Sequence, residues 1–190
     1  MCAVAILTSL DGLQSATADP ASLYGHPVKA LDKTPARTAS AEHQLDVFIS
    51  KLEPKTQTLI RATRKALRRR LPTANELVYD NYNFFVIGYS STARPSDGLV
   101  SIAAGANGVA LSFYWGATLP DPQNVLLGSG RQNRFVRIDS AATLRRPEVK
   151  SLITAAIAQA KMPLPARGRG TLIIRSISAK QRPRRKRVRR

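Results

Sequence analysis

The stretch Glu76–Tyr89 reads ELVYDNYNFFVIGY and is the densest run of aromatic and β-branched residues in the chain. Its middle is polar, with Asp80, Asn81 and Asn83. Aromatic and β-branched side chains favour strands, whereas Asp and Asn favour turns because their side chains bond to nearby backbone groups. The stretch therefore predicts two consecutive strands joined by a turn over Asp80–Asn83, near the centre of a sheet.

More strands are predicted downstream. The dipeptide Asn107-Gly108 predicts a hairpin with a type I′ turn, because both residues tolerate positive φ. After it, apolar residues alternate with small or polar ones, which predicts a half-buried strand with Trp115 on the core face and Tyr114 on the opposite face. The remaining strand candidates are Leu99–Ala103, Arg134–Ile138 and a short final strand at Thr171–Ile174.

Helical patterns lie on both sides of these strands. One helix is predicted over Ser40–Leu52 with Ser40 as its cap, and a second begins at Pro54 and ends at Leu71-Pro72. A third begins at Pro147. The core-facing stripe of the second helix is expected to consist of Ile60, Thr63, Leu67 and Leu71. Helices on both sides of a run of strands predict an α+β fold, with an antiparallel sheet of about five to six strands packed against helices.

The domain organisation follows from composition. Residues 1–40 are rich in Ala, Ser, Thr, Pro and Asp without a sustained period, so we expect a disordered extension. Residues 41–178 are expected to form one α/β domain. Residues 179–190 are expected to form a disordered basic tail, since Lys180–Arg190 contains eight basic residues and no acidic one.

The charge balance favours anionic partners. The chain has 30 Lys+Arg against 12 Asp+Glu, a formal net charge of +18 in 190 residues. Removing the eight charges of the tail leaves +10, so the folded part is basic as well. Such a surface attracts nucleic acid, phosphorylated metabolites or acidic lipid.

Several classes of site and location are disfavoured. Cys2 is the single cysteine, so the sequence predicts no internal disulfide and no Cys-based metal site. No apolar run reaches the about 18–20 residues that span a bilayer, so no membrane partner is expected. The segment Cys2–Leu10 lacks the basic residue that precedes a signal sequence, and Asp11 ends it. We therefore expect a cytoplasmic protein without a cofactor or a metal site.

Three longer segments resemble a known family. They are LPTANELVYDNYNFFVIGYSSTARPSD, LPDPQNVLLGSGRQNRFVRIDSAATLRRPEVKSLITAAIAQA and the terminal SISAKQRPR. Together they are similar to the YdhG-like domain-of-unknown-function family over about residues 45–184. The resemblance implies a two-layer α/β sandwich related to the frataxin-like and iron-chaperone-like group, and it implies little about activity.

The resemblance also raises the hypothesis of an iron chaperone, which we disfavour. Hard cations are bound by several carboxylate oxygens. The first predicted helix offers only Glu42, Asp46 and Glu53, and the second is strongly basic. A cationic surface repels iron and attracts anions.

Two candidate sites for a small ligand follow from local chemistry. In the first, Asp80, Asn81 and Tyr82 would orient a polar ligand or supply a base, although a purely structural turn is the favoured interpretation. In the second, Ser129, Gly130 and Arg131 would bind an anion through backbone N–H groups and the guanidinium, although a plain connecting loop is favoured there. Tyr114 is the candidate for stacking on the ligand.

A separate set of basic residues is expected to contact nucleic acid. On the second predicted helix Arg61, Arg64, Lys65 and Arg68 form a stripe that is either a phosphate-binding or a solvated surface. The candidates in the tail are Arg184, Arg185, Lys186 and Arg187. No helix-turn-helix, RNA-recognition or zinc-finger motif is present, so any binding would be independent of sequence.

The leading hypothesis is a non-enzymatic binding module for an anionic small molecule or partner. It would bind near Asp80–Tyr82, Tyr114 and Ser129–Arg131. The alternative is a sequence-independent nucleic-acid-associated protein. An enzyme comes third, because no nucleophile with a base and an orienting group is visible. A homodimer that covers an exposed apolar sheet face is left open.

Overall fold

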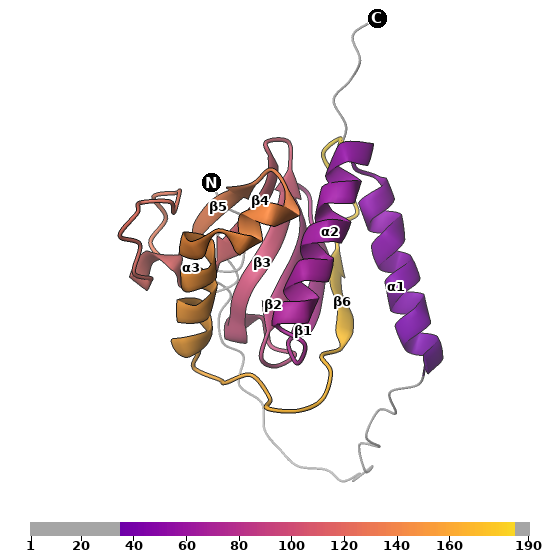
Figure 1. Ribbon diagram of the computed structural model, residues 1–190. Coiled ribbons are helices and arrows are strands. Elements are labelled where there is room, and N and C mark those ends of the chain that lie inside the picture. The colour runs from indigo at the N-terminus through magenta and orange to yellow at the C-terminus, as the bar shows by residue number, and fades with distance from the viewer. Residues whose placement is uncertain (1–34, 185–190) are drawn as a thin grey trace, which may run out of the picture.

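The computed structural model describes residues 35–184, with side chains from Ser40 onward. The described residues form three α-helices and six strands (Figure 1). The helices are α1 (Pro35–Ser50), α2 (Pro54–Arg70) and α3 (Pro147–Ala158). The strands are β1 (Asn75–Asp80), β2 (Phe85–Ser90), β3 (Gly98–Gly105), β4 (Gly108–Phe113), β5 (Arg134–Ile138) and β6 (Leu172–Ile177).

The six strands form one open sheet in the order β5-β4-β3-β2-β1-β6. The predicted α+β class is confirmed. The expectation of an antiparallel sheet needs a correction, because β6 pairs with β1 in parallel while all other neighbours are antiparallel. A parallel pair requires a long connection. Here the chain crosses from β5, at one edge, through α3 to the opposite edge before β6 begins (Figure 1).

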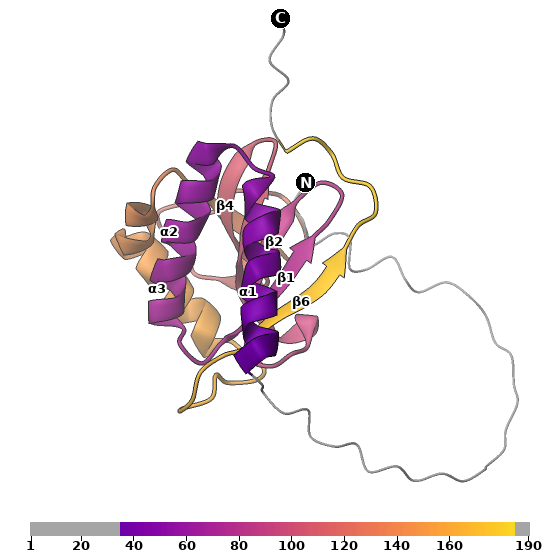
Figure 2. The same ribbon diagram turned by 90° about the vertical axis from the view of Figure 1, so that its right-hand side faces the viewer.

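All three helices cover the same face of the sheet. Figure 2 shows α1 and α2 side by side over this face, with α3 beyond α2. The predicted stripe of α2 is confirmed, since Ile60, Thr63, Leu67 and Leu71 are at most 2% exposed. They pack on the inward residues of the strands, which include Val78, Ile87, Ile102 and Leu111.

The two predicted turns are present, with one difference in geometry. Asn81 N donates to Phe84 O at 2.9 Å and closes the turn between β1 and β2. The β3–β4 hairpin has Gly105 opposite Gly108, and Gly108 has φ +96°. Asn107 does not have positive φ. The turn is therefore not type I′, which needs positive φ at both central residues, and glycine is required only at the first residue of β4.

The first helix begins earlier than the sequence indicates. α1 starts at Pro35, so Ser40 lies within the helix and does not cap it. Pro35 suits the first turn, where its missing N–H costs nothing. The predicted disordered extension, residues 1–40, is wrong for residues 35–40, which are helical, and its residues 1–34 lie outside the described residues. Among the described residues, no helix has both the length and the apolar character needed to cross a membrane.

Candidate functional site

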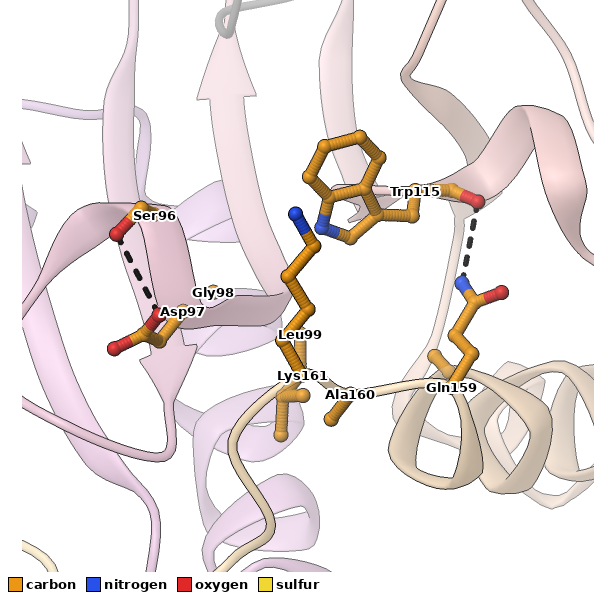
Figure 3. Close-up of a pocket in the computed structure, with 9 residues that line it drawn as sticks. Ser96, Asp97, Gly98, Leu99, Trp115, Gln159, Ala160 and Lys161 are labelled. Carbon is orange, nitrogen blue, oxygen red and sulfur yellow. Dashed lines mark hydrogen bonds between the residues drawn. The ribbon is translucent and has the colours of Figure 1, made fainter.

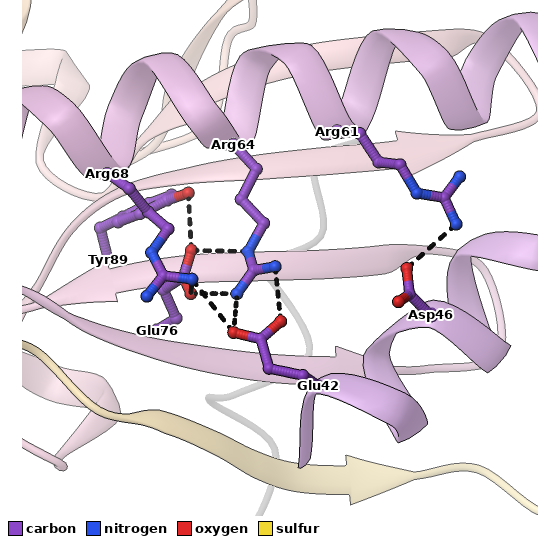
Figure 4. Close-up of polar contacts among 7 residues, drawn as sticks. All are labelled: Glu42, Asp46, Arg61, Arg64, Arg68, Glu76 and Tyr89. Carbon is purple, nitrogen blue, oxygen red and sulfur yellow. Dashed lines mark hydrogen bonds and ion pairs between the residues drawn. The ribbon is translucent and has the colours of Figure 1, made fainter. Parts of the chain in front are cut away.

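A buried carboxylate lies beneath α2, on the helix-facing side of β1. Glu76 is only 3% exposed. Arg64 Nε and Nη2 lie 2.9 and 2.6 Å from its two carboxylate oxygens (Figure 4). The same guanidinium reaches both oxygens of Glu42, each at 2.8 Å. Such two-point contacts are the strong form of ion pair. Arg64 therefore connects α1 and α2 to β1.

Two further side chains complete this network. Arg68 Nη1 lies 3.0 Å from Glu42 Oε1, and Tyr89 Oη donates to Glu76 Oε1 at 3.1 Å. Burial raises the pKa of Tyr89, and the charge of Glu76 raises it further, so the phenol remains a donor. The hydrogen bond from Arg64 holds the pKa of Glu42 below its usual range, against the opposing effect of burial. We call Glu42, Arg64, Arg68, Glu76 and Tyr89 the α2 ion network.

A basic hollow opens beside this network. The α1–α2 hollow lies between the two helices and the segment at Gly168–Arg169, and its volume is about 730 Å³. Among the described residues, Asp46 is the one carboxylate that lines it. Its six cations are Arg61, Arg64, Lys65, Arg68, Arg69 and Arg169. All four basic residues that the sequence assigned to the second helix therefore meet in one concave surface.

The six cations differ in how far they are already neutralised. Arg64 and Arg68 belong to the α2 ion network, and Arg61 Nη2 lies 3.0 Å from Asp46 Oδ1. Within residues 40–184, no carboxylate forms an ion pair with Lys65, Arg69 or Arg169. These last three cations leave the hollow with unbalanced positive charge.

A second basic hollow lies on the other flank of α2. The α2–α3 hollow has a volume of about 510 Å³, and none of the described residues that line it is acidic. Its cations are Lys65, Arg69, Arg70, Arg145 and Lys150. Lys65 and Arg69 line both hollows, so they form a basic ridge along α2 between them.

Asp80 is buried and has structural partners. It is 1% exposed, and Lys51 Nζ lies 2.6 Å from Oδ2 while Arg184 Nη2 lies 2.9 Å from Oδ1. Gln181 Nε2 donates to the Asp80 carbonyl at 3.1 Å. Asp80 has structural contacts, in line with the favoured interpretation, but they are ion pairs with distant side chains and not the nearby backbone bonds expected of a turn residue. Each oxygen of the carboxylate has a cation of the protein as its partner.

These contacts also correct the expected tail. Arg184 has a side chain only 5% exposed and also donates to Asn81 O, and Arg182 N donates to Tyr82 O at 2.9 Å. Residues 181–184 therefore pack against the β1–β2 turn, and Arg184 is not available for nucleic acid. We call the contacts of Lys51, Asp80, Gln181 and Arg184 the C-terminal clasp. Arg185, Lys186 and Arg187 lie outside the described residues.

Asn81 and Tyr82 lie on the turn itself. Asn81 Oδ1 accepts a hydrogen bond from Ser176 at 3.1 Å. Tyr82 is 47% exposed, and the guanidinium of Arg182 lies 5.7 Å from the centre of its ring. Both residues therefore contact the C-terminal part of the chain.

The Ser129–Arg131 loop lies far from Asp80. All three of its residues are exposed, and the loop precedes β5 at one edge of the sheet. Four strand steps separate β5 from β1, which corresponds to about 19 Å. Asp80 also faces the helices. The structure therefore does not bring Asp80 and Arg131 into one site, and the proximity expected from the sequence is wrong.

Two aromatic assignments on the β4 end are also corrected. Tyr114 is 6% exposed and covers Gly98, where an added Cβ would lie 2.6 Å from the ring, so it cannot stack on a ligand. Trp115 is 37% exposed because β4 ends at Phe113, which ends the alternation. Lys161 Nζ lies 5.2 Å from its ring. The adjacent pocket has a volume of only about 10 Å³ (Figure 3).

Sequence reasoning missed the partners of the basic stripe. Glu42 and Glu76 neutralise Arg64 and Arg68, yet they lie 22 and 12 residues away from Arg64 in the chain. One signal was available. Side chains alternate between the two faces of a strand, so Glu76 and Asp80 lie on the same core-facing side as Val78. Because an unpaired buried charge is costly, two carboxylates on that side indicate that cations lie close to them.

Comparison with known proteins provides no further assignment. No protein-family model matches the chain, and neither a curated protein nor a solved structure is significantly similar to it. The resemblance to the YdhG-like family therefore stays a prediction. Within the part of the chain that the structure describes, no group of three or more His, Cys, Asp and Glu residues could hold a metal ion.

Proposed function

We propose that the protein is a non-enzymatic binding module for an anionic small ligand, and that the α1–α2 hollow is its site. The observation that carries the proposal is the convergence of six cations on a hollow with one lining carboxylate. Its volume of about 730 Å³ lies within the usual range of about 300–1,000 Å³ for ligand sites.

The distribution of charge favours a ligand with two or more negative groups. Lys65, Arg69 and Arg169 are the cations without a described carboxylate partner, so they supply the attraction for a ligand. Guanidinium groups bind phosphate and carboxylate at two points, which adds to the attraction. Polyphosphates are therefore the chemical class that fits this surface.

The proposal is tested by calorimetric titration with tripolyphosphate at low salt. The triple variant Lys65→Gln, Arg69→Gln, Arg169→Gln is expected to lose at least tenfold in affinity, because the charge-assisted contacts disappear. Arg94→Gln, in the connection between β2 and β3, serves as the control for lost charge. Equal affinity of the triple variant and this control, or no binding by the wild type, would contradict the proposal.

A second candidate is sequence-independent binding of nucleic acid. It is favoured by the α2–α3 hollow, which extends the basic surface across the ridge of Lys65 and Arg69 to Arg145 and Lys150. A surface spanning both flanks of a helix can contact several phosphates of one strand.

One double variant distinguishes the two candidate functions. Arg145→Gln with Lys150→Gln is expected to weaken binding of a single-stranded oligonucleotide while leaving tripolyphosphate binding unchanged. Affinity for the oligonucleotide should also fall steeply with salt, by a slope of about 0.9 for each phosphate contact with a duplex or about 0.7 for a single strand. Absence of oligonucleotide binding at low salt would remove this candidate.

A further inference from the structure

The sheet face opposite the helices carries a cavity that differs chemically from the two basic hollows. It lies over β3 and β4 and has a volume of about 210 Å³. We call it the outer-face hollow. It is lined by Phe84, Ala103, Gly105, Asn107, Gly108, Val109, Ala110, Ser112, Phe135 and Arg137. None of these residues lines either of the basic hollows.

The floor of the hollow consists of small side chains. Ala103 and Ala110 form a cross-strand pair, and Gly105 lies opposite Gly108 in the same hairpin. Small residues of this kind are depleted in strands, where branched and aromatic side chains usually fill the surface. The small floor creates a depression where an ordinary sheet face would be filled.

Two aromatic rings form opposite walls, and each rests on a glycine. A Cβ added at Gly105 would lie 2.7 Å from the ring of Phe84, and one added at Gly128 would lie 3.3 Å from the ring of Phe135. Phe84 borders β2 and Phe135 belongs to β5, so about three strand spacings, or roughly 14 Å, separate their backbones. Both rings are held in place with the floor between them.

One cation lies at the rim. Arg137 is the cross-strand partner of Ala110, and its Nη1 donates to Asn107 O at 3.1 Å, which holds the guanidinium over the hairpin. No carboxylate of the described residues forms an ion pair with it. The remaining N–H groups of this exposed guanidinium can bind an anion at the edge of an apolar cavity.

We propose that the outer-face hollow binds a small monocarboxylate with a flat apolar body. The body lies on Ala103 and Ala110 between the rings of Phe84 and Phe135, and the carboxylate contacts Arg137. The volume of about 210 Å³ is below the usual range for drug-sized ligands, so the ligand is small. A polyphosphate is not expected here, because the walls are apolar and Arg137 is the one cation among the described residues that line the hollow.

The test uses 2-naphthoate and its neutral analogue 2-naphthylmethanol as probes of the full chain, followed by NMR of the alanine methyl groups. In the wild type, 2-naphthoate should shift the signals of Ala103 and Ala110 saturably. Arg137→Gln should lower the affinity for 2-naphthoate by about tenfold, because it removes a charge-assisted hydrogen bond to the carboxylate. The affinity for 2-naphthylmethanol should not change. Arg94→Gln is the control for lost charge.

Filling the floor tests the cavity itself. Ala103→Leu should abolish binding of both probes, whereas Ala93→Leu, in an exposed loop, adds the same bulk and should not. Far-ultraviolet circular dichroism verifies folding. If Ala103→Leu does not fold, Ala110→Val makes the same test with a residue that favours strands.

Five results would overturn the proposal. Three concern the probes: the absence of a saturable shift in the wild type, equal binding by Arg137→Gln and Arg94→Gln, and unchanged binding by the filled-floor variant. In the fourth, the filled-floor variant changes the oligomeric state, which would assign the face to a second copy of the chain. In the fifth, the filled-floor variant without probe shows new signals from residues 1–34, which would assign the hollow to that segment.

Discussion

At the scale of single residues, the most consequential side chain is Glu76. A carboxylate that is 3% exposed carries a large desolvation cost, which only close cations and donors can offset. Arg64 supplies two contacts and Tyr89 a third. Removing a charged member leaves its buried partner without compensation, whereas removing the Tyr89 hydroxyl leaves the ion pair in place. Loss of the Glu76 charge should therefore lower the stability far more than loss of the Tyr89 hydroxyl.

The first prediction concerns Glu76 and Tyr89. Glu76→Gln should lower the free energy of unfolding by about 3 kcal/mol, because Arg64 loses the buried one of its two carboxylate partners. Tyr89→Phe removes only a hydroxyl and should cost about 1 kcal/mol. Urea unfolding followed by Trp115 fluorescence measures both. Similar small losses in the two variants would show that Glu76 does not anchor the network.

The second prediction concerns the pH dependence of Glu42. Its pKa in the folded protein lies below the usual 4.5, chiefly because of the hydrogen bond from Arg64. Its stabilising contribution is therefore fully present above pH 4.5 and is lost as pH falls through the lowered pKa.

Glu42→Gln should cost roughly 0.5–1 kcal/mol at pH 7, a figure already reduced for solvent screening of a partly exposed group. The difference from wild type should shrink as the pH falls below 4.5 and Glu42 becomes protonated. Asp46→Asn, which breaks an exposed pair, should change stability little across the same pH range. A constant difference across this range would contradict the assignment.

At the scale of elements, the edge strand β6 depends on a close backbone approach. A Cβ at Gly170 would lie 1.7 Å from the carbonyl oxygen of Ala74, and Gly170 N donates to Pro72 O at 2.9 Å. Only glycine allows the chain to enter β6 this close to the start of β1. The entry of the chain into the parallel pairing therefore depends on glycine at position 170.

The third prediction follows. Gly170→Ala should destabilise the protein by about 3 kcal/mol, because backbone must move against backbone. Gly130→Ala is the matched control, since its nearest atom would lie 3.8 Å away, and it should be near neutral. Thermal unfolding compares the two. Equal midpoints would mean that the β6 entry tolerates a shift.

The fourth prediction concerns the C-terminal clasp. Asp80→Asn should release the segment that contains Arg184, because a cation only 5% exposed loses its carboxylate partner. The amides of Ser178 and Arg182, which donate to Asp80 O and Tyr82 O, should then exchange faster with deuterium. Lys180→Gln provides a charge control. Unchanged exchange at both amides would show that the backbone contacts alone hold the segment.

At the scale of the whole molecule, the excess of positive charge serves two purposes that the net value of +18 does not distinguish. Lys51, Arg64 and Arg184 balance buried carboxylates. Lys65, Arg69 and Arg169 line the α1–α2 hollow and form no ion pair with a carboxylate of residues 40–184. Only the second kind of cation can attract a partner, so the count of charges overstates the binding surface.

The fifth prediction separates the two purposes by truncation. Ending the chain after Arg184 removes five basic residues outside the described part and should lower the salt dependence of oligonucleotide binding without changing stability. Ending it after Ala179 also removes the clasp and should lower the midpoint of thermal unfolding. Equal stability of the two truncated proteins would show that Gln181–Arg184 contributes nothing to the fold.

Local patterns in the sequence determined much of the secondary structure of this protein and the core-facing side of α2. The strands on both sides of Asp80–Asn83, the apolar stripe of α2 and the start of α2 at Pro54 were all predicted, because each depends on neighbours a few residues apart. The basic character of α2 was equally visible. For the same reason the candidates along one element, Arg61, Arg64, Lys65 and Arg68, do lie together.

Contacts between distant segments were decided only by the tertiary structure. Asp80 and Arg184 are 104 residues apart, and Glu42 and Arg64 are 22 apart, so no local pattern shows that they pair. The order of the strands likewise separates Asp80 from Arg131 and places β6 parallel to β1. A charge alone does not reveal whether it balances a buried partner or faces a hollow, because that depends on which elements pack together.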